Sequence, residues 1–181
     1  MTEDNIQSSI DCLRNTLNFQ FDISWQMLKI HLNDLEDGEC LWRPSPKGLH
    51  ITNESGNWKA DWPETEDYDI GPPSIAWLTW HIIFWWSMVF DYSFGKGIIS
   101  REDVHWPGNM VAVREKIEQL HDDWENILIT FPEEELLSCE KTKWPFENRS
   151  FYDLASWLNL ELMKNASEIG YGRFLYAVYV K

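Results

Sequence analysis

The chain has 181 residues, of which 44% are hydrophobic and 25% are charged, and its formal net charge is −15. This length suffices for a hydrophobic core, and we expect a single domain over residues 1–181. Phosphate binding requires clusters of Lys and Arg, which the sequence lacks, so its charge argues against nucleic acid and against an anionic membrane surface as partners. The acidity is typical of a protein kept soluble by its charge, and the alternative is an acidic recognition surface.

Cys12, Cys40 and Cys139 are widely separated and form neither a CxxC pair nor an even disulfide framework. We therefore expect reduced, mostly buried thiols in a cytoplasmic protein. The N-terminus has no basic region followed by an apolar run, so a secretion signal is not predicted.

The first predicted helix runs from about Asn5 to Leu35, because apolar residues recur every three or four positions from Ile6 onward. The connection that follows, from Arg43 to Pro73, is long for a plain loop in a compact domain. Within it, "GLHIT" and "WKADW" flank "NESGN", which predicts a short β-hairpin with a Gly-containing turn. The acidic "PETEDYDIGPP" then predicts an ordered surface loop that either covers a site or only spaces two helices.

The second predicted helix contains the apolar run "IAWLTWHIIFWWSMVF", residues 75–90. It follows Pro72-Pro73, with Ser74 as its N-cap, and continues to about Phe94. The run is shorter than the roughly 18–20 apolar residues that a membrane span needs, and tryptophans lie in its middle instead of at its ends. A central helix of a bundle, buried on most sides, is the better interpretation.

Two more helices are predicted in the second half of the chain. The third begins at Asn109, a potential N-cap, and ends at Pro132. The fourth begins at Ser150, which can form a capping box with Asp153, and runs to about Tyr179. Four amphipathic helices without a repeated strand pattern predict an all-α four-helix bundle.

His81 is the first residue that could carry chemistry. On the second helix it shares a face with four apolar side chains: Trp77, Phe84, Trp85 and Met88. An imidazole among aromatic rings is costly to bury unless both ring nitrogens have partners. His81 is therefore either a hydrogen-bonded core residue or a ligand and polar anchor inside the bundle.

The stretch "ELMKNASEIG", residues 161–170, is the second candidate. Asn165 falls within about 20° of the centre of the core-facing side of the fourth helix, and Glu161 about 60° to one side. A buried carboxylate needs a partner, which could be His81, a tryptophan N–H, Arg173 or a bound cation. A purely structural polar network is the alternative, in which these residues only fix the register of the helices. Glu168 lies outside this centre, and we expect it to be solvated.

A third group combines aromatic and polar residues of the connections: His50, Trp58, Asp61, Trp62, His105 and Trp106. They could line the mouth of a pocket, or they could clamp the hairpin onto the bundle. His31 and His121 lie on charged faces and are expected to be solvated. The sequence has no Gly-rich phosphate loop, GxSxG elbow or HExxH motif.

Several strings together resemble the DinB-like superfamily, in particular its tryptophan-rich branch. They are "PPSIAWLTWHIIFWWSMVFDYSFG", "WPG" before the third helix, "KWPF" before the fourth, and "ELMKNASEIGYGRFLYA". The resemblance implies an up-down-down-up four-helix bundle, commonly a homodimer. Many members hold nickel or zinc with three histidines, and some are thiol transferases or isomerases that use low-molecular-weight thiols.

Matched position by position, His81 corresponds to the histidine of the family's second helix. Glu161 and Asn165 stand at the two later histidine positions, so two of the three imidazoles are absent. One imidazole, one carboxylate and one carboxamide form a much weaker nickel or zinc site. His50 or Asp61 could add a ligand only if the hairpin folded over the end of the bundle.

The function that we expect is a small-molecule-binding bundle with a degenerate His/Glu/Asn metal site. Its pocket would contain His81, Glu161, Asn165, Trp77 and Trp85, and any divalent nickel or zinc ion would bind to His81 and Glu161. The alternative is a metal-dependent hydrolase or a transferase acting on low-molecular-weight thiols. A homodimer is the expected assembly.

Overall fold

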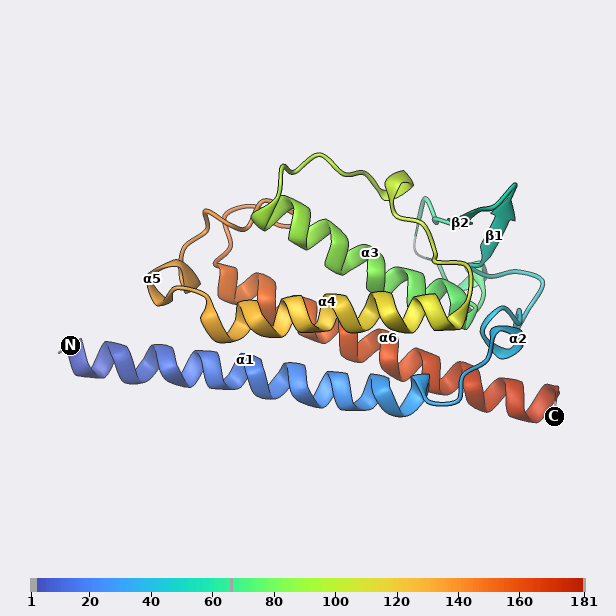
Figure 1. The fold of residues 1–181 in the computed structure, drawn as a ribbon, viewed down its shortest axis with the longest axis horizontal. Coiled ribbons are helices and arrows are strands. Elements are labelled where there is room, and N and C mark those ends of the chain that lie inside the picture. The colour runs from blue at the N-terminus through green and yellow to red at the C-terminus, as the bar shows by residue number, and fades with distance from the viewer. Residues whose placement is uncertain (1–2, 66, 181) are drawn as a thin grey trace.

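Four long helices form a bundle with the up-down-down-up order that we expected. A computed structural model describes residues 3–65 and 67–180, with side chains from residue 10 onward. The long helices are α1 (Glu3–Leu32), α3 (Ile75–Phe94), α4 (Met110–Thr130) and α6 (Phe151–Tyr179). α1 and α6 run in one direction, and α3 and α4 run in the other (Figure 1). The predicted all-α four-helix bundle is confirmed.

The connection between α1 and α3 contains the predicted hairpin. Strands β1 (Ile51–Glu54) and β2 (Asn57–Ala60) pair antiparallel, with Ile51 opposite Ala60. Short turns of helix fill the remaining connections: α2 (Asp37–Cys40), η1 (Tyr68–Ile70), η2 (Arg101–Asp103) and α5 (Glu133–Leu136). The hairpin lies beside the end of the bundle where α3 and α4 begin (Figure 1).

The predicted N-caps are all present. The side-chain oxygens of Ser74 and Asn109 each accept a hydrogen bond from the backbone N–H three residues later. Ser150 and Asp153 form the reciprocal capping box at the start of α6. These side chains satisfy N–H groups that have no partner within their own helix, which explains why the starts of three helices could be predicted from local sequence.

The first helix ends earlier than predicted. The apolar stripe does continue to Leu35, which is buried, but the helix stops at Leu32. The backbone leaves the helical conformation because Asp34 adopts a left-handed φ of 54°. Ile6, the first residue of the predicted stripe, lies outside the side chains that the structure describes.

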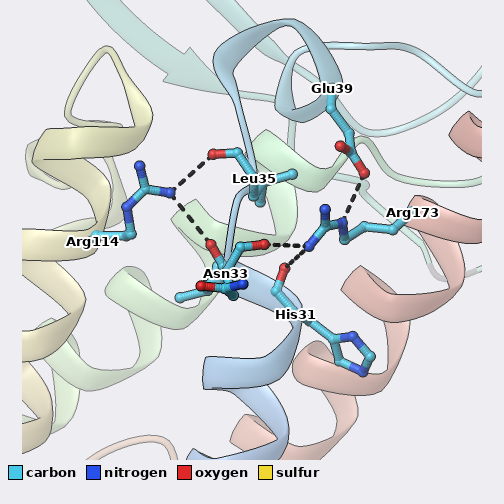
Figure 2. A network of polar contacts seen from close by, with 7 residues as sticks. His31, Asn33, Leu35, Glu39, Arg114 and Arg173 are labelled. Carbon is cyan, nitrogen blue, oxygen red and sulfur yellow. Dashed lines mark hydrogen bonds and ion pairs between the residues drawn. The ribbon is translucent and has the colours of Figure 1, made fainter.

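Two arginines from other helices bind the carbonyl groups at this end of α1 (Figure 2). Arg173 of α6 donates to the carbonyl oxygens of His31 at 3.0 Å and Asn33 at 2.7 Å. Its Nε also donates to the buried carboxylate of Glu39 at 2.8 Å. Arg114 of α4 donates to two further carbonyl groups nearby. The negative end of the helix dipole is thus neutralised, and the last turn of α1 is tied to α4 and α6.

α3 is the central helix of the bundle, as the apolar run predicted. Most of its residues are buried, including Trp80 and Trp86, each only 1% exposed. Among the described residues, none of the helices combines the length and the apolar character that crossing a membrane would require. The side chains of α3 thus pack against the other helices of the bundle.

We expect Arg173→Ala to lower the free energy of unfolding by about 2–4 kcal/mol, because it frees backbone carbonyls and leaves Glu39 buried without its partner. Arg173→Lys should recover part of the loss, since it keeps the charge but not the forked geometry. Urea denaturation followed by circular dichroism measures both. Arg149→Ala, at an exposed arginine, is the matched control and should change stability by less than about 0.5 kcal/mol. Equal effects of the two alanine variants would contradict the role assigned to Arg173.

Candidate functional site

His81 on α3 and Asn165 on α6 meet in the core. Their Nδ1 and Oδ1 atoms are 2.9 Å apart, and Asn165 Nδ2 donates to the carbonyl oxygen of Glu161 at 2.7 Å. On the other side of the imidazole, the indole N–H of Trp85 donates to His81 Nε2 at 2.8 Å. Asn165 is 0% exposed and His81 is 6% exposed. The buried network therefore satisfies both ring nitrogens and both atoms of the amide.

The partners fix the tautomer of His81. An indole N–H can only donate, so Nε2 of the imidazole must be the acceptor, and the proton of the neutral ring is on Nδ1. Nδ1 then donates to Asn165 Oδ1. Burial lowers the pKa of His81 to about 4, outweighing the opposing effect of the hydrogen bond with Asn165. The ring is neutral at pH 7.

A cleft of about 610 Å³ lies over this network. It is lined by residues of α3, of α6 and of the segment that leads from the hairpin to α3, and by Leu49 just before the hairpin. Trp77 stacks on the imidazole of His81 with ring centroids 4.5 Å apart, and the rings of Trp62 and Trp85 also line the cleft. A volume of several hundred Å³, aromatic walls and a few polar groups are typical of sites for small molecules.

Glu161 lies at the cleft, and the ring nitrogens of His81 bond to Asn165 and Trp85 instead of to its carboxylate. Its side chain is 19% exposed, and its Oε2 is 2.9 Å from the ammonium of Lys164. Arg173, which the sequence analysis considered as a partner of Glu161, is paired with Glu39. Asn165 is buried and has a buried partner, as predicted, whereas the carboxylate of Glu161 has its partner on its own helix.

Glu168 is solvent-exposed, as expected, yet it lines the same cleft. Desolvation by the surrounding protein raises the pKa of Glu168, the ammonium of Lys164 opposes this effect, and the carboxylate of Glu161 adds to it. The carboxylate of Glu161, on the same helix, therefore contributes to the raised pKa of Glu168.

The hairpin residues mostly clamp the hairpin onto the bundle. Trp58 packs edge-to-face on Trp106 at 5.1 Å between centroids, and the indole N–H of Trp106 donates to Thr79 of α3 at 3.0 Å. Asp61 Oδ2 accepts a hydrogen bond from the backbone N–H of His50 at 2.9 Å. The ring of His50 is buried, and neither His50 nor Asp61 lines the cleft over His81.

Trp62 separates the cleft from a second hollow. This hollow, of about 440 Å³, is also lined by Arg101 and the exposed His105. The guanidinium of Arg101 lies 5.0 Å from the centre of the Trp62 ring, within the range of a cation–π contact. Trp62 is thus the one member of the hairpin group that lines the cleft containing His81.

The prediction that His121 is solvated is wrong. Its side chain is 12% exposed, and its ring stacks on Trp25 of α1 at 4.0 Å between centroids. His31 is half-buried, with its ring against Gly170: an added Cβ there would lie 2.5 Å from His31 Nε2. Both histidines fill space between helices, because α1 packs closely against α4 and α6.

The cysteines agree with the sequence analysis only in part. Cys12, Cys40 and Cys139 are free thiols, as expected, but only Cys40 is buried. Cys12 and Cys139 are exposed and lie away from the cleft. The expectation of mostly buried thiols is therefore wrong.

The sequence analysis missed Asn159, Lys164 and Glu64. Asn159 is 1% exposed, and its amide accepts from Trp124 at 3.2 Å and donates to the carbonyl oxygen of Leu17 at 3.0 Å. Asn159 lies in the same helix as Asn165, and its spacing from the core-facing leucines could have indicated burial. Lys164 and Glu64 line the cleft, but nothing in their local sequence distinguishes them from surface charges.

The residues around His81 do not fit a nickel or zinc ion. The only lone pair of the neutral imidazole accepts the indole N–H of Trp85, so it is not available to a metal. The amide oxygen of Asn165 accepts from His81, and the carboxylate of Glu161 is paired with Lys164. Within the described residues, no three His, Cys, Asp or Glu side chains form a group that could hold a metal ion.

Comparison with known proteins identifies the family. The sequence model described as the DinB superfamily matches residues 20–169, which is most of the chain and includes α3, the cleft and the His81–Asn165 network. No curated protein and no solved structure gives a significant match.

We expect His81 to remain neutral, as the Nδ1–H tautomer, down to about pH 5, because the pKa of its imidazole is lowered to about 4. Since this pKa lies below its unfolded value, the unfolded state binds more protons between the two values, and stability falls as the pH decreases through this window. From pH 7 to pH 5 the loss from this residue is roughly 2 kcal/mol. The ¹⁵N chemical shifts of the ring nitrogens report the tautomer directly.

His81→Gln is the comparison for the pH dependence of stability. Whatever its stability at pH 7, this variant should lose less than the wild type between pH 7 and pH 5, since it lacks the titrating ring. Urea denaturation at the two pH values measures the difference. An imidazole that titrates above pH 6, or identical pH dependence of the two proteins, would show that the buried network is not closed as described.

Proposed function

The chain belongs to the DinB superfamily, and from this premise and the geometry of the site we propose that it binds a small molecule in the cleft over His81 without a catalytic metal. The observation that carries the proposal is the hydrogen bond from Trp85 to His81 Nε2, at 2.8 Å. It occupies the lone pair that a metal would need and leaves the imidazole as the neutral floor of an aromatic cleft.

The ligand would lie against the stacked rings of Trp77 and His81, with Trp62 on the side of the hairpin segment. Rigid aromatic surfaces bind apolar groups with little loss of conformational entropy, and the few polar groups of the cleft would orient the ligand. His81 and Asn165 would act by holding the floor of the cleft in place, because their polar atoms are already satisfied by one another.

The alternative, a metal-dependent hydrolase or a low-molecular-weight-thiol transferase, has less support. Both would require a metal ion to activate water or a thiol, and the donor atoms around His81 are engaged with one another. Neither exposed cysteine lies at the cleft to serve as a nucleophile in its place.

Binding can be tested with two neutral aromatic probes, benzamide and indole, observed by saturation-transfer NMR and by calorimetry. We expect dissociation constants of about 1 mM, as is usual for fragments of this size. Addition of EDTA should leave them unchanged, and elemental analysis should find far less than one nickel or zinc per chain. Loss of binding on chelation would support the metal-dependent alternative.

Trp62→Ala should weaken binding of these probes at least threefold, since it removes one aromatic wall of the cleft. The matched control is Tyr68→Ala, a neighbouring aromatic residue whose side chain is fully exposed and does not line this cleft. If neither probe binds to the folded wild type, the proposal falls, and the buried polar residues serve only to fix the register of the helices.

We also propose that the protein is a homodimer that pairs through α1 and α6. These helices lie side by side (Figure 1). Each also exposes a row of apolar residues. The exposed residues are Phe19, Ile23 and Ile30 on α1, and Leu160, Tyr171, Phe174 and Val178 on α6. Each row recurs on one side of its helix, which is unusual for a surface left in water and suits a second copy of the same face.

Phe174→Glu should convert the dimer to a monomer, because it places a charge in an apolar interface. Light scattering after gel filtration measures the mass of the wild type and the variant. Val111→Glu, at an equally exposed apolar residue of α4, is the control and should leave the mass unchanged. A wild type that is monomeric at about 100 μM, well above the Kd of a stable dimer, would contradict the proposal.

A further inference from the structure

The cleft over His81 contains more negative than positive groups. Three carboxyl groups line it: Glu64 from the segment that leads to α3, and Glu161 and Glu168 from α6. Lys164 is the one cationic side chain among the described residues that line it. The carboxyl groups of the cleft therefore outnumber its cationic side chains by two, and they come from segments far apart in the sequence.

Lys164 is already paired. Its ammonium is 2.9 Å from Glu161 Oε2, while neither Glu64 nor Glu168 has an ion pair within the part of the chain that the structure describes. The cleft thus offers carboxyl groups whose charge is not balanced by a direct contact. The pKa of Glu168 is raised mainly because the surrounding protein desolvates its carboxyl group; the ammonium of Lys164 opposes this effect, and the carboxylate of Glu161 adds a smaller contribution to it.

The floor and walls of the cleft add no positive charge. His81 is neutral at pH 7, with Trp85 on its Nε2. Arg101 contacts Trp62 but lines the second hollow and not this cleft. That contact also shows that the Trp62 ring can hold a cation against one face, and aromatic faces attract cations through their π electrons.

We propose that the cleft selects an organic cation, in which a protonated amine or a guanidinium is joined to an apolar or aromatic part. The inference rests on the proposed function, because it assigns a ligand class to the same cleft. The apolar part would pack on Trp77 and Trp62, and the cationic group would lie near Glu64 and Glu168. The net charge of −15 would further raise the local concentration of such a ligand.

Three probes with one skeleton test the charge preference: phenethylamine, 2-phenylethanol and 3-phenylpropionate, which carry a cation, a neutral group and an anion on the same two-carbon arm. We expect phenethylamine to bind about tenfold more tightly than 2-phenylethanol at low salt, and 3-phenylpropionate to bind most weakly. The preference should shrink in 0.3 M NaCl, because salt screens partly exposed charges. Calorimetry or ligand-observed NMR gives the three dissociation constants.

Variants of α6 distinguish the charge effect from a change in shape. Glu168→Gln should weaken binding of phenethylamine several-fold and leave 2-phenylethanol unchanged. Lys164→Met should strengthen binding of phenethylamine, because it frees the carboxylate of Glu161, and a gain of affinity cannot result from damage to the fold. Glu147→Gln, at an exposed residue outside the cleft, is the matched control.

The outcomes separate this inference from the proposed function. Tighter binding of phenethylamine that responds to Glu168→Gln and Lys164→Met supports it. If all three probes bind equally, or if 3-phenylpropionate binds best, the cleft is a small-molecule site but the assignment to cations is wrong. If none of them binds to the folded protein, the proposed function fails as well.

Discussion

The hydrogen bond between His81 Nδ1 and Asn165 Oδ1 is the contact on which the site depends. It joins the central helix α3 to α6, and it fixes the imidazole in the tautomer that can accept the indole N–H of Trp85. Because every polar atom of the network has a partner, the ring can be buried without a charge. The neutral imidazole at the base of the cleft and the lack of a free lone pair for a metal follow from this arrangement, and the neutral ring adds no positive charge to the acidic lining of the cleft.

α6 connects this network to the far end of α1. Its sequence "EIGYGR" begins beside the cleft with Glu168 and ends at Arg173, which binds the last carbonyl groups of α1 (Figure 2). Close packing explains why both positions are glycine. The ring of His31 lies against Gly170, and a Cβ on Gly172 would lie 3.0 Å from Ile75 Cγ1. One helix thus sets both the position of the polar floor and the packing of its neighbours.

The fold could be predicted from the sequence because its determinants are local. Caps such as Ser74 and Asn109, and the apolar stripes between them, act within one helix. Burial of Asn165 was predictable for the same reason. Its partner, the pairing of Arg173 with Glu39 and the stacking of His121 on Trp25 depend on how helices are rotated against one another, which no single helix encodes. Glu64 and Lys164 gain their importance only from the cleft that tertiary packing creates.

The engagement of Trp85 with His81 also has a consequence for evolution. A chain that acquired histidine at position 165 alone would lose the amide that accepts from His81, while the indole N–H would still occupy Nε2. Each buried polar group left without a partner costs about 1–3 kcal/mol, so this step toward a set of three imidazoles would produce a less stable protein. Mutations that reshape the exposed walls of the cleft carry no such penalty. Selection acting on this bundle would therefore alter which ligand it binds more readily than it would rebuild a metal centre.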